Sequence, residues 1–230
     1  MSTRQDYLTA IGLLVGGDLP LGEAEKLFAI GAALKKYSGH RPRIIPEDEA
    51  GSGSFDYPLT LLADWTEGFS AIKSVEYPVD DTARATPILQ DDVWLIYQKP
   101  TGKCLRLLEA TPTATESLRI TYTALHACTD ADCTIPSGDE EAVQALAASQ
   151  FCEMLAAYYA QTQDSTIQAD SVDHKSRASE YAGRARAYRK MYYDHMGIKE
   201  SGVPAASVTR DQDMHASWGS DRLTHPRRYR

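Results

Sequence analysis

The residue types most able to do chemistry gather in one short segment that contains His126, Cys128 and Cys133. Imidazole and thiolate are ligands that zinc prefers, but a structural zinc site normally takes four ligands at a tighter spacing. Only Asp130 or Asp132 could complete the set, so we expect ordinary thiols in a surface turn and keep zinc binding as an alternative. A Cys128–Cys133 disulfide would need an oxidising medium, because thiols in a cytoplasm stay reduced.

The remaining polar motifs do not assemble a site for catalysis. Nucleophilic catalysis needs a nucleophile, a base and an orienting group, and none of the six histidines lies in a Gly-x-Ser-x-Gly setting. Gly51-Ser52-Gly53 lacks the lysine and the strand-to-helix context of a phosphate-binding loop. Glu47-Asp48-Glu49 is interpreted as a solvated loop rather than a metal site. These segments therefore give no active site, and we identify no catalytic residue and no cofactor; a metal-dependent enzyme that uses His126, Cys128 and Cys133 stays an alternative.

Charge is distributed unevenly along the 230 residues, which carry a formal net charge of -8. Residues 1–172 contain 12 Lys and Arg against 25 Asp and Glu, whereas residues 173–230 contain 12 against 7. An acidic body with a basic end indicates that the end contacts an acidic partner or the acidic body of a neighbouring copy. No run approaches the roughly 18 apolar residues that a membrane span needs. Met1–Asp6 lacks the pattern of a secretion signal, so we expect a cytoplasmic location.

Helical periodicity predicts a pair of helices at the start of the chain. Ser2 and Gln5 form a capping-box pattern before a helix that stops at Gly16. A second helix is expected from about Gly22 to Tyr37. Because the loop between them is short, these two helices should pack as an antiparallel hairpin.

The period then changes to the alternation that is typical of strands. A short edge strand bounded by prolines is expected at Arg43–Pro46. Lys99–Gly102 predicts a hairpin turn, because proline presets the first corner and glycine tolerates the last. The connections are too short for helical crossovers, so an antiparallel sheet is predicted. Its further strand candidates are Ala71–Tyr77, Val93–Tyr97, Cys104–Leu108 and Ser117–Thr123.

Two further helices are expected after the sheet, and with them the fold class. Ser137–Glu140 is a capping box before the first, and the second runs from about Asp173 to Met196 with Gly197 as a left-handed cap. We predict an α+β fold in which the two helix pairs meet as a four-helix bundle, with an inserted antiparallel β domain and an extended C-terminal arm. The expected divisions are 1–38 for the N-terminal helix pair, 39–134 for the β domain, 135–197 for the C-terminal helix pair and 198–230 for the arm.

The C-terminal arm has no apolar period but contains Trp218, Tyr229 and five arginines. Chain ends are often disordered, yet solvating tails are usually poor in aromatic residues, and Arg and Trp are enriched where surfaces bind. The arm is therefore predicted to bind a partner. The basic last helix also raises nucleic-acid binding as an alternative, although its tyrosines fall mainly on the predicted buried stripe and no DNA-reading motif matches.

Several short segments, taken in order, resemble the head-to-tail adaptor proteins of tailed bacteriophages, also called head-completion or neck proteins. The first is Tyr37–Arg43, which looks like the Tyr-Ser-x-x-Arg-Pro junction of that family. The resemblance covers roughly residues 5 to 197 and rests on structural signatures rather than catalytic ones. Its other segments are Trp65, Gly68–Ser70, Val75–Pro78, Trp94–Tyr97, Arg119–His126, Thr134–Pro136 and Asp164-Ser165.

The resemblance implies a non-enzymatic virion protein that is assembled in the host cytoplasm. Such adaptors form a ring, usually dodecameric, under the portal protein, extend the DNA channel without binding DNA specifically, and dock the tail or the next neck protein. It further implies that the arm anchors on the portal or on a neighbouring subunit. A stopper or tail-completion protein is the alternative within the same class. The expected anchoring residues are Trp218, Arg222, Arg227, Arg228, Tyr229 and Arg230.

Overall fold

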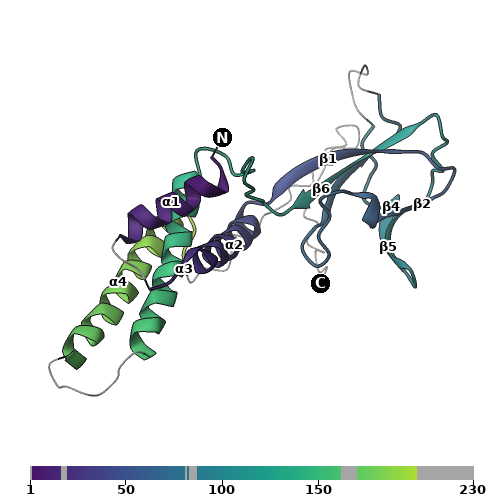
Figure 1. Ribbon diagram of the computed structural model, residues 1–230. Coiled ribbons are helices and arrows are strands. Elements are labelled where there is room, and N and C mark those ends of the chain that lie inside the picture. Colours follow the sequence, from purple (N-terminus) through teal and green to yellow (C-terminus); the bar gives the residue numbers. More distant parts are fainter. Residues whose placement is uncertain (1, 17–19, 81, 83–86, 162–169, 201–230) are drawn as a thin grey trace, which may run out of the picture.

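The structure, a computed structural model, describes residues 2–16, 20–80, 82, 87–161 and 170–200 (Figure 1). Within these residues the chain is α+β, with four α-helices, one short 3-10 helix and two three-stranded antiparallel sheets. The helices gather at one end of an elongated molecule and the sheets at the other (Figure 1). No helix in the described part of the chain is long and apolar enough to cross a membrane.

The helices are organised around α3 (Glu140–Gln161), which contacts α1 (Arg4–Val15), α2 (Glu23–His40) and α4 (Asp170–Met196). The predicted four-helix bundle of two hairpins is therefore wrong, because α1 and α2 make only slight contact with each other and each packs on α3 instead. Length is one reason: the 12 residues of α1 span about 18 Å, whereas the 22 residues of α3 span about 33 Å. A helix so short cannot line the whole length of a bundle.

The core of the helical end is built from aromatic side chains set between small ones. Phe151 and Tyr192 are fully buried, as are Tyr7 and Tyr37. Small residues on α3 let its neighbours approach closely, as ridges pack into grooves between helices. The buried alanines of α3 are Ala142, Ala145, Ala147 and Ala148.

The observed helix ends differ in detail from the predicted ones. The capping box of α1 joins Thr3 and Asp6, not Ser2 and Gln5, and the Ser2 hydroxyl donates to Glu140 over 2.5 Å instead. Helix α2 continues through His40, three residues beyond the expected Tyr37. It ends where Pro42 restricts the residue before it to extended backbone.

The predicted sheet is in fact two sheets. The first has the order β1–β6–β3, from Arg43–Ala50, Ser117–Ala124 and Ile72–Glu76. The second has the order β2–β5–β4, from Asp56–Pro58, Gly102–Leu107 and Trp94–Lys99. A three-stranded sheet on its own would expose its apolar face to water. When two such sheets pack face to face, the apolar face of each is buried against the other. The two sheets share one core, formed mainly by Tyr57, Val75, Leu105, Leu107, Leu118, Ile120 and Tyr122.

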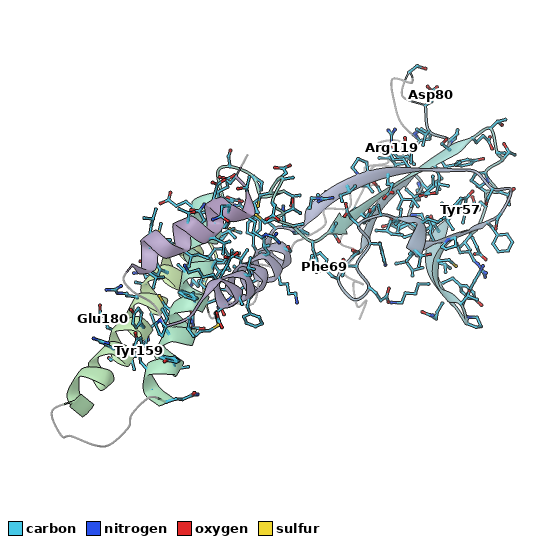
Figure 2. The ribbon with its side chains drawn as sticks, in the orientation of Figure 1. Tyr57, Phe69, Asp80, Arg119, Tyr159 and Glu180 are labelled. Carbon is cyan, nitrogen blue, oxygen red and sulfur yellow. The ribbon has the colours of Figure 1, made fainter. Side chains whose placement is uncertain are left out.

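Strand β1 is twice as long as predicted, because the acidic run that was expected in a loop belongs to it. Asp48 lies opposite Arg119 of β6 and accepts its Nε and Nη2 hydrogens at 2.6 and 2.8 Å. Glu47 accepts the hydroxyl hydrogen of Tyr122 over 2.8 Å. Cross-strand partners thus let an acidic run join the sheet, and Figure 2 shows Arg119 among the sheet side chains. The predicted turn between β4 and β5 is confirmed, with Lys99 paired to Gly102.

Candidate functional site: the junction of helices and sheets

A highly connected polar group at the meeting point of helices and sheets is Asp139, immediately before α3. Its side chain is only 8% exposed. It accepts a hydrogen bond of 2.5 Å from the Tyr37 hydroxyl and two from Arg41 Nη1, at 2.7 and 2.9 Å. His195 Nε2 lies 2.9 Å from its Oδ1. One carboxylate therefore joins the end of α2, the start of α3 and the end of α4.

Electrostatics keep this carboxylate ionised. Burial raises the pKa of Asp139, but the hydrogen bonds from Tyr37, His195 and Arg41 outweigh burial and lower it to about 2. Burial and the bond to Asp139 both raise the pKa of Tyr37, so its hydroxyl stays a donor. A carboxylate just before a helix is also stabilised by the helix dipole.

His126 ties the segment after β6 to the end of α2. Its Nε2 lies 3.0 Å from the carbonyl oxygen of Arg41 and its Nδ1 lies 3.1 Å from Thr134 Oγ1. Nδ1 also lies 3.0 Å from the carbonyl oxygen of Thr134, so both ring nitrogens face acceptor oxygens. The backbone N–H of His126 donates to the Ser38 hydroxyl over 2.9 Å, and Ser38 donates in turn to the Leu34 carbonyl. Burial lowers the pKa of His126 and so favours the neutral ring.

A second contact between α2 and α4 pairs two rings. His40 Nδ1 lies 2.7 Å from the hydroxyl of Tyr192, and the two rings are stacked with centroids 5.7 Å apart. Burial, and then the neighbouring Lys36, lower the pKa of His40. We call the whole set the junction network, which comprises Tyr37, Ser38, His40, Arg41, His126, Asp139, Tyr192 and His195.

The chemistry of the junction network is structural. Its donors and acceptors satisfy one another, so Asp139 is a fixed anion with no proton to exchange near neutral pH. Sequence reasoning placed Asp139 in a capping box but found none of its partners, since Tyr37 lies 102 positions away along the chain. The one available signal was Tyr37–Arg43, one of the segments that carry the resemblance.

The candidate metal ligands are not assembled into a metal site. Both ring nitrogens of His126 are engaged by protein atoms. Cys128 and Cys133 lie opposite each other in an isolated antiparallel bridge, as free thiols. Among the described residues, no group of three or more His, Cys, Asp or Glu side chains is arranged to hold a metal ion.

The cavities on the described surface include one beside α3 and one beside the β4–β5 turn. One of about 630 Å³ lies beside the first turn of α3 and includes Ser2, Asp6 and Glu140 in its wall. Asp6 caps α1 and Glu140 accepts from Ser2, so these carboxylates already have structural partners. The other, of about 520 Å³, lies beside the β4–β5 turn and is lined partly by Trp65 and Lys103. Neither wall brings together groups for a recognisable reaction.

Exposed apolar side chains occur on both the sheets and the helices of the described surface. Leu95, Ile96 and Tyr97, three successive residues of β4, are 38%, 44% and 41% exposed. On the helical end, Leu13 and Phe28 are 80% and 70% exposed. Strand β4 forms an edge of its sheet, with no described strand beyond it.

The predicted anchoring residues, Trp218, Arg222, Arg227, Arg228, Tyr229 and Arg230, lie outside the described residues. Comparison with protein-family models and with curated proteins returns no match for this chain.

Proposed function

We propose that this chain is a structural protein of the neck of a tailed bacteriophage, a head-to-tail adaptor whose copies form a ring under the portal. The resemblance described above suggests the class. The observation that carries the proposal is the apolar edge strand β4, because it is a surface that a second copy of the chain would cover.

An edge strand offers a row of unpaired backbone N–H and C=O groups, and monomeric proteins usually blunt such an edge with charge, proline or a bulge. Here the middle of β4 is Leu95-Ile96-Tyr97, with no charge and no proline. Contact of this strand with a different face of the next copy is a head-to-tail arrangement, which closes into a ring when the rotation between copies allows it. The strand is thus suited to subunit contact.

The junction network supports the same role. It holds the helices against the base of the sheets through hydrogen bonds from four chain segments, including Tyr37–Asp139 and His126–Arg41. A ring subunit that receives one neck component on one side and presents a surface to another needs its two ends held in fixed orientation. A rigid junction provides this.

The test is cosedimentation of the protein with portal rings from the same particle, comparing the full chain with Ile96→Lys and with a chain that ends at Gly197. The full chain is expected to join the portal as a ring. Lysine on β4 should abolish the ring, because a charge would be buried in the contact. Thr101→Lys is the matched control, since it adds the same charge at the exposed turn beside β4.

The other outcomes separate the alternatives. If the full chain does not bind the portal, the adaptor proposal is refuted, and binding to a preformed portal–adaptor complex would favour a stopper protein. If the full chain binds and Ile96→Lys binds equally well, β4 is not the subunit contact. Loss of binding in the chain that ends at Gly197 would assign the anchor to residues 198–230.

A further inference from the structure

The hairpin 127–134, between β6 and α3, brings two free cysteines face to face. Cys128 and Cys133 are opposite each other in an antiparallel bridge. The flanking hydrogen bonds run from Thr129 N to the Asp132 carbonyl, 2.8 Å, and from Thr134 N to the Ala127 carbonyl, 2.9 Å. Because these bonds join the residues on either side, the cysteines occupy a non-hydrogen-bonded pair, the position where facing side chains are closest.

This register meets the geometric requirement for a disulfide. Opposite Cα atoms of a non-hydrogen-bonded pair lie about 4.5 Å apart, and disulfides span Cα separations of about 4.4–6.8 Å. Of the other two cysteines, Cys104 lies on β5 and Cys152 in the core of the helical end, and neither has such a partner in the described chain. We propose that Cys128 and Cys133 form a disulfide when the protein meets an oxidising medium, as a covalent lock on hairpin 127–134.

The lock would act on the start of the chain. Arg4 donates its backbone N–H to the Thr129 carbonyl over 2.9 Å, and its guanidinium forms an ion pair with Asp130. Hairpin 127–134 thus holds the first turn of α1 beside α3. Closing the ring at Cys128–Cys133 fixes the turn that carries both contacts, so oxidation makes this part of the helical end harder to open.

The chemistry is a thiol–disulfide exchange with a small-molecule disulfide such as oxidised glutathione. The Cys128 thiol is the more exposed of the two, so its thiolate attacks one glutathione sulfur, forms a mixed disulfide and releases one glutathione thiolate. The Cys133 thiolate then attacks Cys128 Sγ, forms the internal S–S bond and releases the second glutathione. The cysteines lose two electrons, the reagent gains them, and the two thiol protons pass to the released thiolates. Burial raises the pKa of Cys128, so the first step is slow at neutral pH and faster in mild alkali.

The experiment uses the folded full-length protein, incubated with oxidised glutathione at mildly alkaline pH, quenched with acid, denatured and alkylated. We expect two alkyl groups per chain instead of four, a mass lower by two hydrogen atoms before alkylation, and a Cys128–Cys133 linked peptide on digestion. Cys133→Ser should instead hold one glutathione on Cys128. Cys104→Ser is the control and should still form the internal bond.

A second readout tests the lock itself. Oxidation should raise the Tm of the helical transition by about 5 °C, as expected for a short closed loop in a chain of this size, and Cys133→Ser should abolish the rise. Four alkylated cysteines after incubation, stable glutathione adducts without an internal bond, or an unchanged Tm in the oxidised protein would each overturn the proposal. None of these results depends on the protein being a neck component.

Discussion

Replacing Asp139 by asparagine tests the role of the junction network most directly. The pKa of this carboxyl falls from the ordinary 3.8 to about 2 in the folded protein, which corresponds to about 2 kcal/mol of stability at neutral pH. The asparagine side chain would keep an acceptor for Tyr37 but lose the charge that faces Arg41 and His195. We therefore expect Asp139→Asn to lower the free energy of unfolding by about 2 kcal/mol at pH 7, or the Tm by about 4–8 °C.

The shifted pKa of Asp139 also predicts how the stability lost in Asp139→Asn should change with pH. The carboxyl has a lower pKa in the folded than in the unfolded chain, so the unfolded state binds the extra proton and acid destabilises the fold. The stabilisation from Asp139 is complete above the unfolded pKa and is lost as the pH falls toward the folded value of about 2. The difference between wild type and Asp139→Asn should therefore be largest near neutral pH and shrink steadily below about pH 4.

The assay is urea unfolding followed by circular dichroism at a helical wavelength, repeated across this pH range. Asp130→Asn is the control, because Asp130 pairs with Arg4 while both side chains are exposed, and such pairs contribute about 0–1 kcal/mol. A loss in Asp139→Asn no larger than in the control would refute the reasoning. So would a loss that stays constant down to the lowest pH at which the protein folds.

Further predictions concern packing and backbone space, all measured by urea unfolding. Gly51→Ala should destabilise the protein by about 2 kcal/mol or more, because the added methyl group would lie 2.0 Å from the carbonyl oxygen of Thr113. Gly31→Ala should stabilise the protein by about 0.5–1 kcal/mol, because alanine favours a helix more than glycine does and the added methyl group would have no atom within 4 Å. If this substitution destabilised the protein, the surface of α2 around Gly31 would not be open as described. Phe151→Ala should cost about 3–5 kcal/mol by opening a cavity in the helical core, and a loss below about 1 kcal/mol would show that this core is not packed as described.

Local signals in the sequence predicted the elements better than their arrangement. Periodicity located all four helices, and the Lys99–Gly102 turn followed from proline and glycine geometry. The bundle failed because helical periodicity shows which face is buried but not which helix covers it. The division into two sheets failed for the same reason, since alternation in β5 and β6 does not say whether their apolar faces lie in one sheet or oppose each other.

Sequence reasoning missed the acidic part of β1 and the partners of Asp139 for a different reason. Charge usually indicates solvent, but Glu47–Glu49 belongs to a strand in which Arg119 lies opposite Asp48 and the Tyr122 hydroxyl donates to Glu47. Tyr37 and Asp139 meet only once α2 and α3 have packed. Such pairings depend on contacts between residues far apart in sequence, and no local pattern encodes them.

The connection between the two ends of the molecule has a mechanical consequence. Helix α2 passes into β1 across Arg41 and Pro42, and β6 returns beside β1 toward α3, with Arg43 opposite Ala124 at the base of the ladder. A single connecting chain would act as a swivel, because a torque applied to it is dissipated by rotation about single bonds. Two strands joined by a ladder lack that free rotation, because their hydrogen bonds limit how far one strand can turn about the other. A turning force on the sheets therefore reaches the helices more fully than it would through a single connecting chain.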